Sequence, residues 1–115
     1  MVKLESLKKS SQFRKILKGK KVNSDYFSIF ATKNFIKPKS KASLLISFVM
    51  KKKIGNAVKR NKIRRKLKAI VNILLKKKGA INRDYTYIVF GKTKAYTGNY
   101  NILLSEMSKV LKKIK

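Results

Sequence analysis

Residues 55–77 have the sequence GNAVKRNKIRRKLKAIVNILLKK, and they predict the central helix of the fold. Gly55 interrupts the preceding pattern, and Asn56 is a residue type that caps helices. Lysines at 76–78 favour the C-terminus through the helix dipole, and Gly79 ends the helix. Five apolar residues recur at helical spacing and form one stripe that faces a core. They are Ile63, Leu67, Ile70, Val71 and Leu74.

Segments on both sides of this helix alternate with period two, which is typical of strands. Tyr26 to Thr32 and Ala42 to Met50 show this alternation, and Asp84 to Phe90 is rich in β-forming residues. Asn34 to Lys41 contains the only proline, so we expect an exposed hairpin connection there. The chain thus predicts strands before and after the central helix.

Two further helices are expected near the ends of the chain. Ser10 or Ser11 can cap a short helix that Gly19 would close as a left-handed C-cap. The apolar positions of this first helix are Phe13, Ile16 and Leu17. The last helix shows Tyr100, Leu103, Leu104, Met107, Leu111 and Ile114 at helical spacing. The fold class that follows is α+β, with helices packed on a small sheet, as a single domain over residues 1–115.

Charge is the most unusual property of the composition. Thirty-two Lys and Arg oppose four acids, which gives a net charge of +28, and no acid occurs between Asp25 and Asp84. Self-repulsion of this size is tolerated mainly where a polyanion neutralises it. The apolar runs are far shorter than the ~20 residues that span a bilayer, and no signal-peptide pattern follows the N-terminus. We therefore expect a cytoplasmic protein whose partner is a nucleic acid and not a membrane.

The residue types present argue against catalysis by the chain itself. Cys and His are absent, which removes disulfides, the usual zinc ligands and histidine proton transfer. The four acids are dispersed along the chain, whereas two-metal nuclease centres need carboxylates that converge on ions ~4 Å apart. They are Glu5, Asp25, Asp84 and Glu106.

The basic residues of the central helix lie together on one side. With Ile63 at zero degrees and a step of 100° per residue, the arc from about 100° to 200° holds three basic residues and an amide. Arginine can grip two phosphate oxygens, and the amide adds a donor and an acceptor. Basic faces are often merely solvated, but the near absence of acids favours a polyanion. The arc consists of Asn61, Arg64, Arg65 and Lys68.

A second and weaker anion site is expected just upstream of the helix. Lys51, Lys52 and Lys53 lead into Gly55 and Asn56, so lysines lie beside the free backbone amides of a helix N-terminus. Such a site suits a phosphate or a hydrated metal ion.

Residues 52–65, KKIGNAVKRNKIRR, closely resemble the signature of the bacterial ribonuclease P protein family. Leu7-Lys8-Lys9 followed by Phe13, and the strand Phe27-Ser28-Ile29-Phe30, also look like this family, so the resemblance covers nearly the whole chain. It implies a fold like the second domain of ribosomal protein S5, in the order α-β-β-β-α-β-α with a left-handed βαβ crossover. Such a hand cannot be expected from pattern alone, because parallel crossovers are nearly always right-handed.

The same resemblance implies the function and the partners. The protein would be the accessory subunit of an endoribonuclease holoenzyme, ribonuclease P, whose catalyst is a large RNA that requires Mg²⁺. It would bind this RNA as a monomer in a 1:1 complex and help to hold the 5′ leader of precursor tRNA in a cleft. No residue of the protein is assigned as a Mg²⁺ ligand.

Site residues carry over where this sequence matches the family. The predicted RNA-binding residues are Lys52, Lys53, Asn56, Arg60, Asn61, Lys62, Arg64, Arg65 and Lys68, and Lys68 stands where the family usually has Arg. The predicted leader-cleft residues are Phe13, Leu17, Phe30, Ser47 and Lys51. Leu17 replaces an aromatic residue and Phe30 replaces Tyr. Phe90 and Gly91 fall where the family often has basic residues, so Lys92 or Lys94 is expected to supply that charge.

Two other interpretations remain open at this point. Without the resemblance, simple core packing is the favoured interpretation of Phe13 and Phe30. A basic ribosomal protein that binds rRNA structurally would show a similar charge, and it would differ in having no effect on tRNA cleavage.

Overall fold

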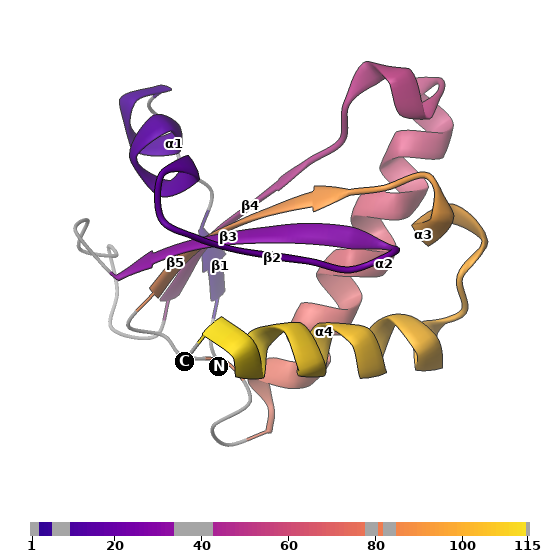
Figure 1. Cartoon of the computed structure of the whole chain (residues 1–115). Helices are drawn as coiled ribbons and strands as arrows, with labels where there is room; N and C mark the ends of the chain where they lie inside the picture. The colour runs from indigo at the N-terminus through magenta and orange to yellow at the C-terminus, as the bar shows by residue number, and fades with distance from the viewer. Residues whose placement is uncertain (1–2, 6–9, 34–42, 78–80, 82–84, 115) are drawn as a thin grey trace.

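A computed structural model describes residues 3–5, 10–33, 43–77, 81 and 85–114 (Figure 1). The strands are β1 (Lys3–Glu5), β2 (Lys20–Asn23), β3 (Phe27–Lys33), β4 (Ser43–Val49) and β5 (Tyr85–Gly91). The helices are α1 (Ser10–Leu17), the 3-10 helix η1 (Lys52–Ile54), α2 (Ala57–Leu75), α3 (Lys94–Thr97) and α4 (Tyr100–Ile114).

The strands form one mixed sheet in the order β1-β4-β5-β3-β2. β1, β4 and β5 are parallel, whereas β3 runs antiparallel to both β5 and β2. Because β4 and β5 are neighbours, α2 is the crossover between two adjacent parallel strands. The predicted order α-β-β-β-α-β-α is confirmed from α1 to α4, and the structure adds β1 at one sheet edge and α3 ahead of α4. The left hand of the crossover stays a prediction.

The main core lies between one face of the sheet and the helices α2 and α4 (Figure 1). The predicted alternation in β3 is confirmed, since Phe27, Ile29 and Ala31 have no exposed surface. The apolar stripe of α2 is confirmed as well, because all five of its residues are at most 1% exposed. Burying a large aliphatic side chain stabilises a fold by about 1.5–3 kcal/mol, so this layer supplies much of the stability.

The opposite face of the sheet is covered only in part. Ile16 of α1 and Ile88 of β5 are fully buried there, and four partly buried side chains pack around them. These are Phe13, Phe30, Val49 and Phe90. Beyond α1 this face is open, and Phe30 and Phe90 form the floor of the groove described below.

The expectations for Gly19 and Tyr100 are wrong. Gly19 is not a left-handed cap, since among the described residues positive φ occurs only at Gly55. A Cβ on Gly19 would lie 2.5 Å from the carbonyl oxygen of Ala31, so glycine is needed there for close approach of α1 to β3. Tyr100 does not join the apolar stripe of α4, because it is 49% exposed at the first turn.

Some expectations fall outside the described part of the chain. These are the connection from Asn34 to Lys41 and the strand start at Asp84. The helix end expected at Gly79 is wrong, because α2 ends at Leu75 and Lys76 is its C-cap. Within the described residues, no helix combines the length and the hydropathy that a membrane crossing requires.

Candidate nucleic-acid interface

The basic face of α2 is exposed along its length. Asn61, Arg64, Arg65 and Lys68 all point away from the core, opposite the buried apolar stripe. The Nη1 atom of Arg64 donates a hydrogen bond of 3.1 Å to Oδ1 of Asn61, so these two side chains order one another. The face presents cations and one amide without an acid on α2 itself.

Arg60 lies at the margin of this face and is half-buried. Its Nε atom is shielded from solvent and has no hydrogen-bond partner among the described residues. An unpaired buried donor costs about 1–3 kcal/mol, so an acceptor that reached Arg60 would relieve that cost.

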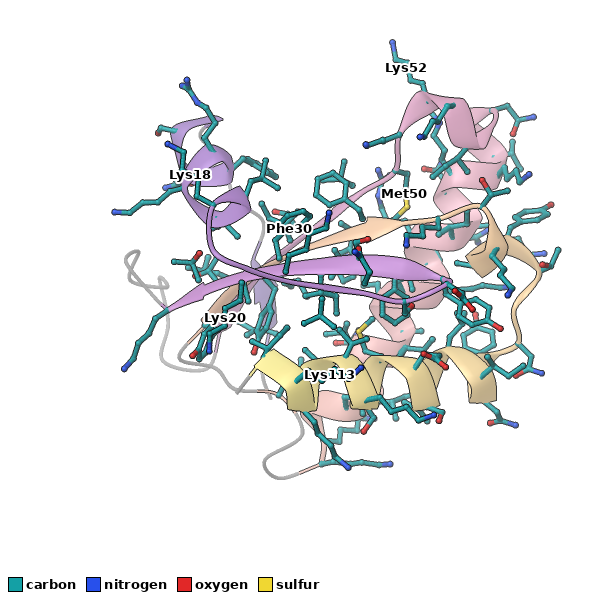
Figure 2. All side chains as sticks on the ribbon, viewed as in Figure 1. Lys18, Lys20, Phe30, Met50, Lys52 and Lys113 are labelled. Carbon is teal, nitrogen blue, oxygen red and sulfur yellow. The ribbon has the colours of Figure 1, made fainter. Side chains whose placement is uncertain are left out.

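The chain enters α2 through a turn that carries two exposed lysines. Lys52 and Lys53 belong to η1, and Figure 2 shows Lys52 projecting from the end of the molecule where η1 meets α2. Gly55 adopts φ 150°, and Asn56 caps the helix by accepting a hydrogen bond of 2.9 Å from the backbone NH of Lys59. The predicted N-cap is confirmed, and it occupies the Oδ1 atom of Asn56.

Lys62 lies apart from the other predicted RNA-binding residues of α2. Its ammonium is 4.8 Å from the centroid of the Tyr96 ring, in α3. Helical geometry accounts for this, because Lys62 is about 100° away from Asn61 and turned toward the flank that meets α3. The residues predicted from the signature therefore occupy two sides of one helix.

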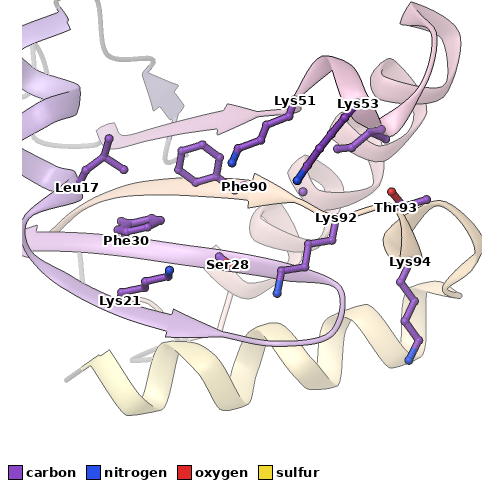
Figure 3. A pocket seen from close by; sticks show the side chains of 12 residues that line it. Leu17, Lys21, Ser28, Phe30, Lys51, Lys53, Phe90, Lys92, Thr93 and Lys94 are labelled. Atoms are coloured by element: carbon purple, nitrogen blue, oxygen red, sulfur yellow. The ribbon is translucent and has the colours of Figure 1, made fainter.

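A groove of about 780 Å³ lies on the open face of the sheet (Figure 3). It runs from Leu17 at the end of α1 to the segment Lys92–Lys94 that follows β5, and strands β2 and β3 contribute to it. Its lining residues are Leu17, Lys21, Ser28, Phe30, Lys51, Lys53, Ile54, Phe90, Gly91, Lys92, Thr93 and Lys94.

The floor of the groove is aromatic and its sides are basic. The rings of Phe30 and Phe90 meet edge to face, with centroids 5.4 Å apart and planes at 74°. The ammonium of Lys21 lies 5.3 Å from the Phe30 centroid, and that of Lys51 lies 5.8 Å from the Phe90 centroid. Aromatic faces beside ammonium groups are what single-stranded nucleic acids bind, because bases stack and phosphates pair with the cations.

The segment that follows Phe90 contacts the turn between β2 and β3. Lys92 Nζ donates a hydrogen bond of 2.6 Å to the carbonyl oxygen of Ser24, and Lys94 Nζ lies 3.6 Å from Oδ2 of Asp25. Both lysines line the groove, and their replacement of basic charge at 90 and 91 stays a prediction. A side chain at Gly91 would collide with Met50, since an added Cβ would lie 2.4 Å from its sulfur.

The structure brings together some of the predicted leader-cleft residues and separates others. Leu17, Phe30 and Lys51 line the groove. Phe13 does not line it and packs with the buried pair under α1, as the core-packing alternative expects. Ser47 is 6% exposed on β4 and does not line it either.

Three features of the site were not predicted. Lys21 and Lys53 were not assigned to the groove, because the pairing of β2 with β3 and the turn at η1 bring them there. Phe90 was noted only as a departure from the family and is half of the aromatic floor. The alternation along β5 could have predicted this position of Phe90. Ile88 and Phe90 lie on the opposite face of the strand from Tyr87 and Val89.

Comparisons with known proteins show the family of the chain. The family model described as Ribonuclease P matches residues 1–115. The ribonuclease P protein component of Streptococcus agalactiae serotype III is 31% identical over 113 residues, which cover 97% of this chain and 95% of the relative. That of Mycoplasma mycoides subsp. mycoides is 28% identical over 109 residues, which cover 95% of this chain and 94% of the relative.

Solved structures show the same fold. The ribonuclease P protein of Staphylococcus aureus superposes with a TM-score of 0.71 at 26% identity, over 96% of this chain and 94% of the other. The protein from Thermotoga maritima gives a TM-score of 0.75 at 24% identity, over 96% of this chain and 98% of the other. At 24% identity, the likeness to the Thermotoga maritima protein shows the fold alone.

Proposed function

This chain belongs to the bacterial ribonuclease P protein family, and we propose that within the ribonuclease P holoenzyme it binds the catalytic RNA and the 5′ leader of precursor tRNA. Removal of the leader by endonucleolytic cleavage matures the 5′ end of tRNA. The observation that carries the proposal is the pairing of an exposed, acid-free helix face with a separate groove of aromatic floor and lysine sides.

The basic face of α2 suits a folded RNA. Asn61, Arg64, Arg65 and Lys68 are all exposed, and Arg64 is already ordered by Asn61. Each phosphate contact releases counterions, so several cations on one exposed face favour a polyanionic partner. We propose that this face, with Arg60 at its margin, docks on the catalytic RNA, and that Lys52 and Lys53 extend the contact.

The groove suits a single strand. Its length runs from Leu17 to Lys94, and Phe30 and Phe90 offer aromatic surface to an unstacked base. Lys21 and Lys51 can move from the rings to phosphates at little cost, because a cation–π contact at a partly exposed site is worth about 0.5–1 kcal/mol. We propose that the leader lies along this groove.

The catalytic centre is proposed to lie on the RNA. The described residues contain no group of three or more His, Cys, Asp or Glu that could hold a metal ion, so this part of the chain does not fit a Mg²⁺ site built from such ligands. The proposed roles of the protein are therefore to bind, to orient and to screen phosphate repulsion. A monomer in a 1:1 complex with the RNA is the proposed stoichiometry.

Reconstitution tests this function. The protein is added to its cognate catalytic RNA at low magnesium concentration, and cleavage of leader-bearing precursor tRNA is measured. We expect faster cleavage with the protein than with the RNA alone, and no cleavage by the protein alone. An unchanged rate would favour a ribosomal RNA-binding role, and cutting by the pure protein would place the catalytic groups on this chain.

A further inference from the structure

Tyr96 lies beside a second basic flank of α2. The ammonium groups of Lys59 and Lys62 are 5.0 Å and 4.8 Å from the centroid of its ring. On the scale that places Ile63 at zero degrees, these lysines occupy about 320° and 260°, whereas the docking face occupies about 100° to 200°. The ring and its two lysines are therefore separate from the docking face and from the groove lining.

The positive charge on this flank is not balanced by the protein. Among the described residues, neither Lys59 nor Lys62 forms an ion pair with a carboxylate. Two ammonium groups that share one ring repel each other, which offsets part of the attraction that either gains from the ring. A ligand that brought phosphates to the lysines would relieve this repulsion and would free the ring.

The ring is held on a firmly anchored backbone. α3 has only four residues and could not be stable alone. Lys66, buried in α2, donates hydrogen bonds to the carbonyl oxygens of Ala95, Tyr96 and Gly98, at 3.3, 2.7 and 2.9 Å. Tyr96 is itself half-buried against the main core, so its position is restrained while part of the residue stays accessible. Such prior ordering lowers the entropic cost of binding a ligand.

We propose that Tyr96, Lys59 and Lys62 form a subsite for one unpaired RNA nucleotide, whose base stacks on the ring while the ammonium groups bind the flanking phosphates. An unpaired nucleotide fits better than a duplex, because paired bases do not offer a free face for stacking. The inference rests on the proposed function for the RNA itself. Two RNAs carry the same chemistry, the catalytic RNA and the precursor tRNA, and the experiment separates them.

Substitution of the ring tests the subsite. Tyr96→Leu keeps an apolar side chain against the core and removes the stacking surface, whereas Tyr96→Phe keeps the ring. Tyr85→Leu is the matched control, because Tyr85 is also half-buried at the core edge and carries one lysine, Lys20, at 5.6 Å from its ring. Two affinities are measured: that of the protein for the catalytic RNA, and that of the assembled holoenzyme for precursor tRNA.

We expect Tyr96→Leu to weaken one of these affinities by about fivefold or more, the lower end of the loss for one aromatic base stack. Tyr96→Phe and Tyr85→Leu should stay near the wild type. The affinity that falls identifies which of the two RNAs supplies the nucleotide. Equal affinities for Tyr96→Leu and Tyr85→Leu in both arms would overturn the subsite.

A second measurement tests the subsite even if the Tyr96→Leu variant folds poorly. Ultraviolet crosslinking of the wild-type holoenzyme, followed by peptide mapping, should attach a nucleotide to Tyr96, and no attachment there would overturn the proposal. Failure of the subsite is distinct from failure of the proposed function. In the first case wild-type protein still stimulates cleavage, and in the second it does not.

Discussion

Lys66 and Tyr96 join the central helix to the short helix that follows β5: the buried ammonium of Lys66 donates a hydrogen bond of 2.7 Å to the carbonyl oxygen of Tyr96. Lys66 is 9% exposed and makes two further bonds to carbonyl oxygens of the same segment. A lysine buried this deeply is costly unless its charge is hydrogen-bonded, and here three backbone acceptors supply that compensation.

Replacement of this lysine should destabilise the fold. Lys66→Met retains an apolar stem but leaves buried carbonyl groups without a donor, so we expect the free energy of unfolding to fall by about 1–3 kcal/mol. Urea denaturation measures it, and the shift in midpoint at constant slope reports the change in stability. Lys68→Met, exposed on the same helix, should change the free energy by no more than about 0.5 kcal/mol. Equal effects of the two variants would contradict a special role for Lys66.

The same residue should give the stability a dependence on pH. Burial lowers the pKa of the Lys66 ammonium below 10.5, and repulsion from Lys62 lowers it further. The folded state then binds fewer protons at this site than the unfolded state between the lowered pKa and 10.5, so the contribution of Lys66 to stability rises with pH in that window. The difference in unfolding free energy between wild type and Lys66→Met should shift in favour of the wild type as the pH is raised toward 10.5. A difference independent of pH would contradict the lowered pKa.

Neutralising the docking face should change the salt dependence of RNA binding. Arg64→Ala combined with Arg65→Ala should weaken holoenzyme assembly and flatten the plot of log affinity against log salt, by ~0.9 for each lost duplex phosphate contact. Lys112→Ala with Lys113→Ala, exposed at the end of α4, removes the same charge from another helix and serves as the control. If both pairs flatten the slope equally, the binding is a general effect of charge and not of this face.

Loss of the aromatic floor should affect the leader more than the body of tRNA. Phe30→Ala removes a ring that lines the groove, so we expect the affinity for precursor tRNA to fall more than that for mature tRNA. The loss of one base stack corresponds to ~1–3 kcal/mol. Phe13→Ala, which empties a neighbouring position outside the groove lining, controls for damage to the packing under α1. Equal losses for both tRNAs would assign Phe30 to the core.

An aromatic residue at position 17 should improve leader binding. Leu17 lines the groove and is 39% exposed, so an aromatic ring at this position can reach a ligand without entering the core. We expect Leu17→Phe to tighten the binding of precursor tRNA severalfold, with mature tRNA unaffected. Competition binding with both tRNAs measures this. A gain for mature tRNA as well would mean that the ring contacts something other than the leader.

Much of the fold was predictable because core-facing residues recur with the period of their element. The stripe from Ile63 to Leu74 and the alternation in β3 are local patterns, and both are buried as predicted. The exposed arc from Asn61 to Lys68 follows from the same periodicity. Local patterns do not report close approach between distant segments, so Gly19 was assigned to the wrong role and β1 was not recognised.

The α+β class, the exposed basic face of α2 and the resemblance to one family could all be predicted from the order of residues. The residues that share the groove, the contact of Lys62 with Tyr96 and the burial of Lys66 among carbonyl groups became visible only in the folded chain. Periodicity shows on which side of an element the core lies, and it does not show which elements are neighbours. Strand order and register bring together residues as far apart as Lys21, Lys51 and Lys92, and neither is encoded in any short stretch of the chain.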